Sequence, residues 1–302
     1  MSPTAVTTTA VHPTHPGLRA DRPAWAPSSP CGSECLPPRT KGLSWHLVHR
    51  TLALVTTLLA GVVALPFLPL LGDERRDRAV GALFRAVLRA AGIELRLAGE
   101  TGYRTEPGRG VLVVANHLSW IDVVAFGAVA PVRMLSKREV ADWPLLGDLA
   151  RRCGTLFVDR AGLHGLPAVV AETAGALRAG AVVGVFPEGT TWCGSASGPF
   201  RRAAFQAALD AGVPVRPVRI TLELPGGRPT TAGAFVGNET LWDSVARVLR
   251  LPGLVCELTL LPALAPLGDR RTLARRAELA VSGTAPSVTT ATPIVGTELA
   301  AG

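Results

Sequence analysis

The sequence predicts an α/β fold, a largely parallel sheet with flanking helices, preceded by an N-terminal membrane-associated helical hairpin. Two observations predict this arrangement. Beyond residue 92, short β-rich runs alternate with helical stretches, which is typical of α/β layers with parallel strands. Before residue 92, an uncharged apolar segment at 51–72 is followed by a basic amphipathic stretch. A hydrophobic content of 48% with only 18% charged residues excludes a disordered chain.

The ends of the chain differ in composition from the rest. Residues 1–42 are rich in proline, serine and threonine, with almost no periodic apolar residues, and residues 283–302 repeat that composition. Such segments cannot bury enough apolar surface to offset the entropy of ordering. We therefore expect a disordered head at 1–42 and a disordered tail at 283–302.

The cysteines predict neither a disulfide framework nor a metal site. The chain has five cysteines, an odd number, and they are scattered. Cys31 and Cys35 with His46 and His49 superficially resemble a zinc finger. The gap between the two pairs and the gap between the two histidines are shorter than the usual pattern, and two prolines interrupt the spacer. The sequence therefore predicts no metal ligands.

The segment at 51–72 is a candidate membrane helix that two prolines interrupt. The helix interior before Pro66 spans only about 22 Å, short of the roughly 30 Å hydrocarbon core. The following stretch places apolar residues at helical spacing and Arg78, Arg85 and Arg89 together on another face. We expect residues 43–91 to form a hairpin that dips into one leaflet of the cell membrane. A single-pass span and an ordinary surface helix are the alternatives, and arginines on both flanks leave the orientation open.

The α/β part is expected at residues 92–282. The expected strands lie at 93–97, 111–115, 133–136, 155–158, 182–186, 215–221 and 255–261, and the expected helices at 119–129, 166–178 and 201–210.

Asn116, His117 and Asp122 form the first chemical motif, directly after the apolar strand 111–115. Strand ends of this kind are where α/β proteins place their sites. A histidine can take a proton from a hydroxyl, and a carboxylate can orient it and stabilise its cation. The competing interpretation is structural, because Ser119 and Asp122 also form the S-x-x-D pattern of a capping box. The motif alone leaves both open.

The second motif is Phe-Pro-Glu-Gly-Thr at residues 186–190, directly after another strand. Proline and glycine around Glu188 indicate a tight turn that presents the carboxylate and nearby backbone N–H groups, although a plain turn explains the same flanks. Basic residues accompany the two motifs, and Lys137, Arg138 and Arg160 could form a cationic pocket for an anionic headgroup. Arg201 precedes a helix further on.

The order N-H-x4-D, G-x-x-F-V-D-R, F-P-E-G-T and V-P-V-x-P-V, over about residues 111–221, closely resembles the glycerolipid acyltransferases. The best-known members of that family are the 1-acyl-sn-glycerol-3-phosphate acyltransferases. The resemblance implies a two-helix membrane motif before an α/β acyltransferase domain, His117 as general base and Asp122 as its partner. It implies no metal and no organic cofactor.

Substrate contacts follow from the same resemblance. Glu188, Gly189 and Thr190, with Asn116 of the first motif, would help bind the acceptor or the thioester. Lys137, Arg138 and Arg160 would contact an acceptor phosphate. The chain departs from the family at Thr191, where members acting on glycerol phosphate usually carry arginine. Arg201 or Arg202 could replace that lost guanidinium. Alternatively, the acceptor carries no phosphate monoester, because the F-P-E-G-T-T motif also resembles lyso-ornithine lipid acyltransferases.

The expected activity is transfer of a fatty acyl group from acyl-CoA or acyl carrier protein to the free hydroxyl of a lysolipid. The first choice of acceptor is 1-acyl-sn-glycerol-3-phosphate, giving phosphatidic acid, and the alternative is lyso-ornithine lipid or another lysophospholipid. The expected location is the cell membrane, monotopic or single-pass, with the site on the cytoplasmic side.

A non-catalytic basic membrane-binding protein is the rival of a different class, since a formal net charge of +8 favours an anionic membrane surface. Intact His117, Asp122 and Glu188 count against it. No nucleic-acid partner is expected, since aromatics make up only 5% and no base-reading motif occurs.

Overall fold

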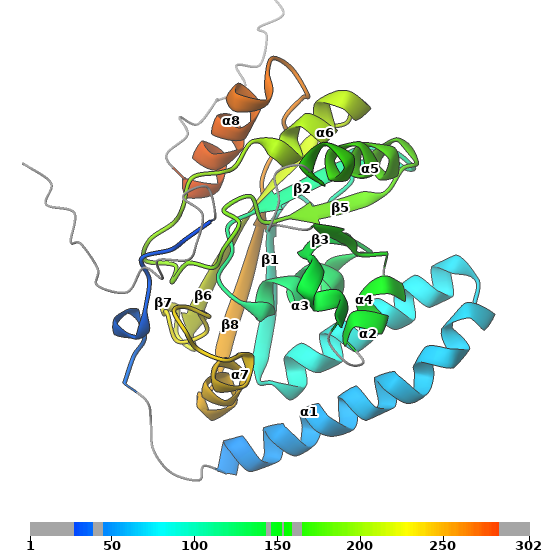
Figure 1. Cartoon of the computed structure of the whole chain (residues 1–302). Helices are drawn as coiled ribbons and strands as arrows, with labels where there is room; N and C mark the ends of the chain where they lie inside the picture. The colour runs from blue at the N-terminus through cyan, green and yellow to red at the C-terminus, as the bar shows by residue number, and fades with distance from the viewer. Residues whose placement is uncertain (1–26, 39–44, 143–145, 153, 159–164, 284–302) are drawn as a thin grey trace, which may run out of the picture.

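A computed structural model describes residues 27–38, 45–142, 146–152, 154–158 and 165–283 of the chain (Figure 1). The strands are β1 (Ile93–Gly99), β2 (Val111–Ala115), β3 (Arg133–Lys137), β4 (Leu156–Val158), β5 (Val182–Val185), β6 (Val215–Leu224), β7 (Arg228–Pro229) and β8 (Leu254–Leu260). They form one sheet in the order β1-β8-β6-β2-β5-β3-β4, with β7 beside β6. Every neighbouring pair is parallel except β6 with β8 and β6 with β7. The predicted largely parallel sheet with flanking helices is confirmed.

The sheet is covered on both faces, and β2 shows why. All five residues of β2 are fully buried. Successive side chains of a strand point to opposite faces, so Val111, Val113 and Ala115 join one apolar cluster while Leu112 and Val114 join another. The first cluster includes α3 (Trp120–Val129), and the second includes α5 (Leu166–Arg178), α6 (Ala203–Ala211) and α8 (Arg270–Ser282). A strand buried on both faces is apolar throughout, which matches its sequence.

Two N-terminal helices lie against the first face. The helix α1 (Trp45–Ala64) continues into a 3₁₀ segment at Leu65–Leu70, and α2 (Asp73–Ala90) follows. The change of helix type falls directly before Pro66, as the proline rule predicts. Glycines allow close packing on both sides of α2, because a Cβ at Gly61 of α1 would lie 3.0 Å from Leu83 and one at Gly127 of α3 would lie 2.5 Å from Phe84. The helical hairpin that the sequence predicts is therefore present.

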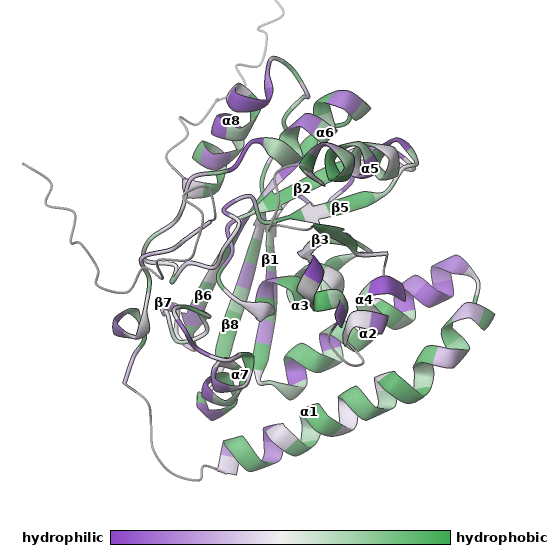
Figure 2. Cartoon of the chain, in the orientation of Figure 1, coloured by the Kyte–Doolittle hydropathy of each residue, from purple (hydrophilic) through white to green (hydrophobic). Residues whose placement is uncertain are grey.

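The outer side of α1 is an apolar surface. The stretch Trp45–Leu70 is long and apolar enough to cross a membrane, by length and composition, and only 6% of an 18-residue apolar window within it is buried. Figure 2 shows that α1 is mainly apolar along its length, whereas α2 begins with hydrophilic residues. Exposed apolar area of this extent marks an interaction surface. The exposed large side chains are Trp45, Val48, Leu52, Val55, Leu58, Leu59, Val62, Val63, Phe67 and Leu70.

The structure differs from the sequence-based prediction at residues 27–38. They were expected to belong to a disordered head, yet they lie on the α/β domain, with a 3₁₀ turn at Ser33–Cys35 and Cys31 buried. Cys31 and Leu36 pack there against Trp192 and Val236, which the local pattern of the sequence does not reveal. The rest of the expected head, and the expected tail beyond Gly283, lie outside the described residues.

Three helices were not predicted. They are α4 (Leu146–Arg152), α7 (Leu241–Arg250) and α8, and a 3₁₀ segment at Arg138–Asp142 precedes α4. Of these, α7 matters for the N-terminal hairpin, because the Arg50 guanidinium of α1 donates to the carbonyls of Leu251 and Pro252 directly after α7, at 2.6 and 3.1 Å. The hairpin is thus attached to the domain at its base.

Candidate active site

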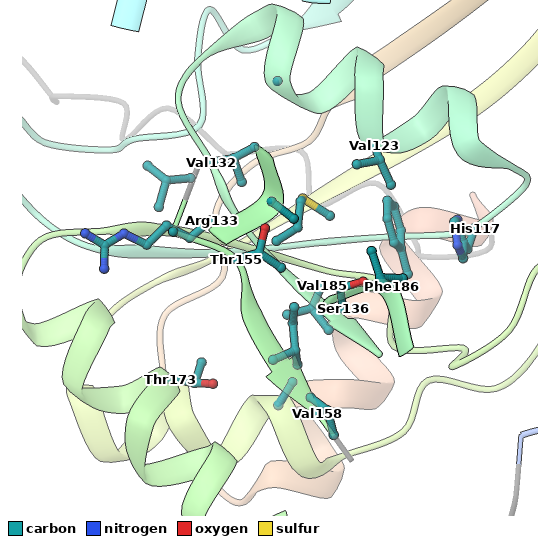
Figure 3. A pocket seen from close by; sticks show the side chains of 18 of the residues that line it. His117, Val123, Val132, Arg133, Ser136, Thr155, Val158, Thr173, Val185 and Phe186 are labelled. Atoms are coloured by element: carbon teal, nitrogen blue, oxygen red, sulfur yellow. The ribbon is translucent and has the colours of Figure 1, made fainter. Parts of the chain in front are cut away.

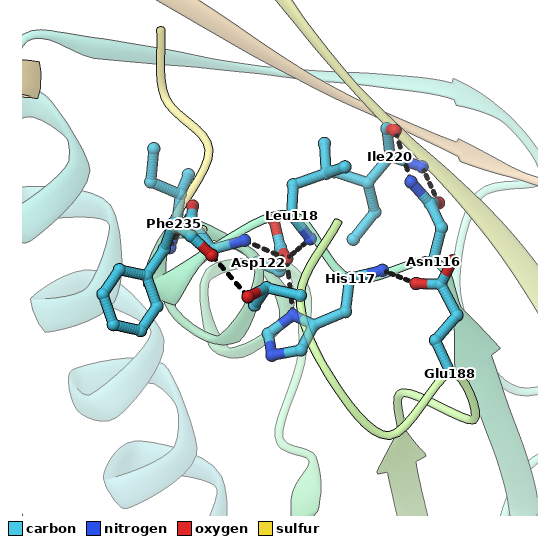
Figure 4. A network of polar contacts seen from close by, with 10 residues as sticks. Asn116, His117, Leu118, Asp122, Glu188, Ile220 and Phe235 are labelled. Carbon is cyan, nitrogen blue, oxygen red and sulfur yellow. Dashed lines mark hydrogen bonds and ion pairs between the residues drawn. The ribbon is translucent and has the colours of Figure 1, made fainter. Parts of the chain in front are cut away.

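His117 and Asp122 meet at the carboxyl end of β2, where the strand leads through a short loop into α3. The His117 Nδ1 atom lies 2.7 Å from Asp122 Oδ2 (Figure 4). The histidine is in the loop and the aspartate is in the first turn of α3, the one placement that lets residues five positions apart face each other. The sequence-based expectation that these two side chains pair is confirmed by this contact.

Asp122 also caps α3, so the contact with His117 and the capping box occur together. The backbone N–H groups of Leu118 and Ser119 donate to the same Oδ2 atom, at 2.6 and 2.8 Å. Ser119 completes the capping box, and its Oγ accepts from the Ile121 N–H at 3.2 Å. Asp122 is fully buried. Hydrogen bonds to an ionised carboxylate are the stronger kind, so the cap holds a negative charge in a fixed place beneath the imidazole.

The His117 ring is held flat and partly open. It stacks on Phe186, with ring centroids 4.0 Å apart and planes 5° apart, and its side chain remains 21% exposed. With Nδ1 turned to a carboxylate, the neutral imidazole carries its lone pair on Nε2. Since His117 lines the large pocket described below, Nε2 is the atom that can accept a proton from a bound hydroxyl.

Glu188 joins two loops at the same edge of the sheet. It follows β5, the parallel neighbour of β2, so the ends of the two strands lie side by side. Its Oε2 accepts from the His117 N–H at 2.6 Å, and its Oε1 accepts from the Gly198 N–H at 2.8 Å. Burial raises the pKa of this carboxyl from 4.5 to about 7, and the two N–H donors oppose that rise. The contacts described for the Glu188 side chain are therefore with the backbone N–H groups of two other loops, which it holds in place.

Asn116 makes a similar brace. Its amide donates to the Ile220 carbonyl at 3.0 Å and accepts from the Ile220 N–H at 2.9 Å, so it ties the start of the site loop to β6. Neither Asn116 nor Glu188 was expected to have a backbone partner so far away in sequence. The shared signal in the sequence was only that each stands at the end of a strand.

A pocket of about 2010 Å³ runs past His117. Figure 3 shows His117, Phe186 and Val123 close together along it. Gly189 and Thr190, which the family resemblance names as substrate contacts, also line it. The N-terminal hairpin supplies an apolar wall that consists of Leu54, Leu58, Leu65, Leu68, Val80, Phe84 and Val87. The wall therefore connects the histidine to the helices that carry the exposed apolar surface.

The predicted cationic residues are placed unequally. Arg201 lines the pocket, and its N–H donates to the Pro187 carbonyl at 2.9 Å. Lys137 is the last residue of β3, and Arg138 is exposed at the start of the 3₁₀ segment and is not among the described residues that line the pocket. Arg160 lies outside the described residues. Arg202, the predicted alternative to Arg201, lines the pocket as well. The sequence analysis did not select the other lining arginines, namely Arg76, Arg104, Arg133, Arg152, Arg270, Arg271 and Arg275.

Hydrogen bonds join the loop after Glu188 to the loop that carries His117 and to a second loop at Phe235, which the sequence analysis did not predict. Thr191 Oγ1 donates to the Phe235 carbonyl, and the Phe235 N–H donates to the Leu118 carbonyl at 2.8 Å. The Trp192 N–H donates to the His117 carbonyl at 2.8 Å. The Thr191 hydroxyl, at the position where an arginine was noted as missing, therefore serves this contact.

A histidine–carboxylate pair at a strand end, open to a pocket with an apolar wall, is an arrangement that can activate a hydroxyl beside an apolar chain. A family model described as Acyltransferase matches residues 96–221. The lyso-ornithine lipid O-acyltransferase of Pseudomonas aeruginosa is 39% identical over 189 residues, covering 62% of this chain and 70% of that protein. The 1-acyl-sn-glycerol-3-phosphate acyltransferase of Neisseria meningitidis is 36% identical over 176 residues, covering 57% of this chain and 68% of that protein.

The fold has a solved counterpart. The crystal structure of the 1-acyl-sn-glycerophosphate (LPA) acyltransferase from Thermotoga maritima aligns with a TM-score of 0.61 at 21% identity, covering 79% of this chain and 92% of that one. This similarity shows the fold alone. The extent of the sequence matches shows the family: the chain belongs to the acyltransferase family.

Proposed function

We propose that the protein transfers a fatty acyl group from a thioester donor to the free hydroxyl of a lysolipid. The observation that carries the proposal is the His117–Asp122 pair at 2.7 Å, facing a pocket whose wall is the apolar hairpin. Such a pocket accommodates an acyl chain, and the pair supplies a base for the hydroxyl proton. The names of the two relatives, one acting on lyso-ornithine lipid and one on 1-acyl-sn-glycerol-3-phosphate, support the lysolipid class.

In the proposed mechanism, His117 Nε2 removes the hydroxyl proton as the oxygen attacks the thioester carbonyl, and buried Asp122 stabilises the imidazolium that forms. The C–S bond then breaks, and the donor thiol leaves with the proton that the His117 imidazolium returns to its sulfur. Backbone N–H groups in the turn at 188–190 are the candidates for holding the oxyanion, apart from that of Gly189, which donates to the Phe186 carbonyl at 3.1 Å. Gly189 adopts a φ of +77°, the left-handed conformation that glycine accepts without strain, and this sets the direction of those groups. Glu188 and Asn116 position this assembly through their backbone contacts.

Direct transfer, without an acyl-enzyme, is part of the proposal. Ser119 and Cys193 are the nucleophile candidates closest to the motifs in sequence. Ser119 is fully buried in the helix cap, and Cys193 is 4% exposed in an apolar cluster. A substrate cannot reach either without local unfolding, so a ternary complex of donor, acceptor and enzyme is expected.

The identity of the acceptor depends on the arginines. Arg201 in the pocket, with Lys137, Arg138 and Arg160, is proposed to meet an acceptor phosphate, and 1-acyl-sn-glycerol-3-phosphate is the first candidate. Lyso-ornithine lipid is the second, favoured by one observation: residue 191 is a threonine whose hydroxyl is engaged with the Phe235 carbonyl and offers no guanidinium to a phosphate.

We further propose that the exposed face of α1 enters one leaflet of the cell membrane, with the site on the cytoplasmic side and an acyl-CoA or acyl carrier protein as donor. The domain boundaries follow: a hairpin at 43–91 and the catalytic domain at 92–282. Carbonate washing should leave the full-length chain in the membrane fraction. Recovery in the soluble fraction without detergent would contradict the hairpin insertion.

An acceptor panel tests the activity. The purified, detergent-held protein is incubated with labelled acyl-CoA and, separately, with lysophosphatidic acid, lyso-ornithine lipid and other lysophospholipids, and lipid products are measured by mass spectrometry. At least one acceptor should be acylated, and His117→Ala should abolish the product. A product that persists in His117→Ala would contradict the proposed base, and good acylation of lyso-ornithine lipid alone would assign the second acceptor.

A further inference from the structure

Three cysteines that are far apart in sequence meet beside the active-site loop. The Sγ atoms of Cys31, Cys35 and Cys193 all lie within 4.8 Å of one another. Cys31 and Cys193 are 6% and 4% exposed, and Cys35 is half-buried. Cys31 precedes the 3₁₀ turn Ser33–Cys35 of the N-terminal segment, Cys35 is the last residue of that turn, and Cys193 belongs to the loop that follows Glu188. His46 and His49, which the sequence suggested as partners, lie in α1 and are not part of this group.

The geometry suits a metal ion better than a disulfide. Zinc binds thiolates at about 2.3 Å in a tetrahedron, which places the sulfurs about 3.8 Å apart. A disulfide brings two sulfurs to about 2.05 Å and leaves the third thiol unused. The sequence spacing fits as well, since Cys31-x3-Cys35 is within the usual spacing of a pair of zinc ligands, with a further ligand supplied from elsewhere in the chain.

Donor groups surround the sulfurs in the way that thiolate ligands require. The Ser29 hydroxyl and the Cys193 N–H lie within hydrogen-bonding reach of the Cys31 sulfur. The N–H groups of Ser195 and Ala196 lie within reach of the Cys193 sulfur. Such hydrogen bonds fix the direction of metal ligands and offset part of their charge.

We propose that Cys31, Cys35 and Cys193 bind one zinc ion as thiolates, with a water molecule as the fourth ligand. Binding releases the thiol protons to solvent and forms three Zn–S bonds. No fourth histidine, cysteine or carboxylate joins the group among the described residues, which is why the fourth ligand is assigned to solvent.

The ion would fix the N-terminal segment to the active-site loop. The two already touch at Pro27, because a Cβ added to Gly189 would lie 2.7 Å from the Pro27 ring, and Pro27 lines the pocket. The segment is also held at the Cys35 carbonyl, which accepts from the Thr231 hydroxyl at 2.6 Å. Cys193 follows Trp192, whose N–H holds the His117 carbonyl. The zinc ion therefore holds the N-terminal segment 27–38 against the loop that carries Glu188.

Metal content of the full-length, detergent-purified protein tests the proposal without reference to activity. After incubation with Zn²⁺ under reducing conditions and removal of excess metal, we expect about one zinc ion per chain by inductively coupled plasma mass spectrometry. Co²⁺ in place of Zn²⁺ should give thiolate charge-transfer absorption and the visible bands of a tetrahedral site. Cys193→Ser should lose at least nine-tenths of the metal, and Cys256→Ser, in the buried strand β8 and outside the group, should retain it.

A second measurement uses the wild-type chain alone, so that it stands even where a variant fails to fold. Alkylation followed by peptide mapping should show Cys31, Cys35 and Cys193 protected with Zn²⁺ and modified after chelation, and proteolysis within residues 27–38 should become faster. Less than about a tenth of an equivalent of metal on reduced wild type, equal metal in Cys193→Ser, or a disulfide within the group that persists in place of metal overturns the proposal.

Discussion

Replacing Asp122 with asparagine separates its role as a helix cap from its proposed role beside His117, because only the proposed role needs a negative charge. Oδ2 accepts from the Leu118 and Ser119 N–H groups as a helix cap and contacts Nδ1 of His117, its proposed catalytic partner. Asparagine can place its amide oxygen at that position and its nitrogen where Oδ1 lies, an atom that is buried with no hydrogen-bond partner among the described residues. The cap is then retained, while the negative charge beside the imidazole is lost.

The expected sizes of the two effects differ. Opposite unit charges about 4 Å apart attract by about 4 kcal/mol at an effective dielectric constant of about 20. Because the imidazolium forms only as the reaction proceeds, this loss falls on the barrier and corresponds to a rate decrease of roughly 10³-fold. Stability changes less, by about 2 kcal/mol or below, because weaker neutral hydrogen bonds are partly offset by removal of a buried charge.

Initial rates of acyl transfer and thermal unfolding, measured on the same detergent-held samples, give the two quantities. Ser119→Ala is the matched control, since it removes the Oγ acceptor of the Ile121 N–H and leaves the carboxylate and its histidine in place. It should cost about 1 kcal/mol of stability and change the rate only a few-fold. If Asp122→Asn also unfolds at lower temperature but turns over like Ser119→Ala, Asp122 is a cap and the dyad is wrong.

Three further outcomes are expected. Because burial raises the pKa of Glu188 from 4.5 to about 7 in the folded state, its contribution to the unfolding free energy should fall by about 3 kcal/mol as pH rises across that window. Glu188→Gln should remove this slope, and an unchanged slope in that variant would assign it to other groups. Gly127→Ala places a Cβ 2.5 Å from the Phe84 ring and should lower the free energy of unfolding by about 1–3 kcal/mol. Its control, Gly175→Ala, has nothing within 4 Å of the new Cβ and should raise the free energy of unfolding by up to about 1 kcal/mol. Equal effects of the two variants would show that α2 moves aside without cost. Arg160→Lys keeps the positive charge but loses the planar guanidinium that can donate two parallel hydrogen bonds to a phosphate, so KM for the lysolipid should rise more than KM for acyl-CoA. Two unchanged KM values would leave Arg160 as a surface ion-pair residue.

Several features were determined by local sequence. The strand 111–115 was predicted at its observed bounds because a run of apolar β-formers buried on both faces needs no partner to be recognised. The end of the regular α1 helix before Pro66 follows from a missing N–H and a steric clash, both of them local. Ser119 as the expected N-cap placed Asp122 in the first turn of α3, which allowed it to face His117. The resemblance to the glycerolipid acyltransferases then implied the pair.

Only the tertiary structure decided which residues contact groups far along the chain. Asn116 binds Ile220, and Glu188 binds the His117 backbone, because β6 and β5 both lie beside β2 in the sheet, and strand order is not written in any local pattern. The proximity of Cys31 to Cys193 could not be predicted from the sequence for the same reason. The folded sheet brings their two loops to one place, and side-chain contacts across such separations depend on how the layers pack.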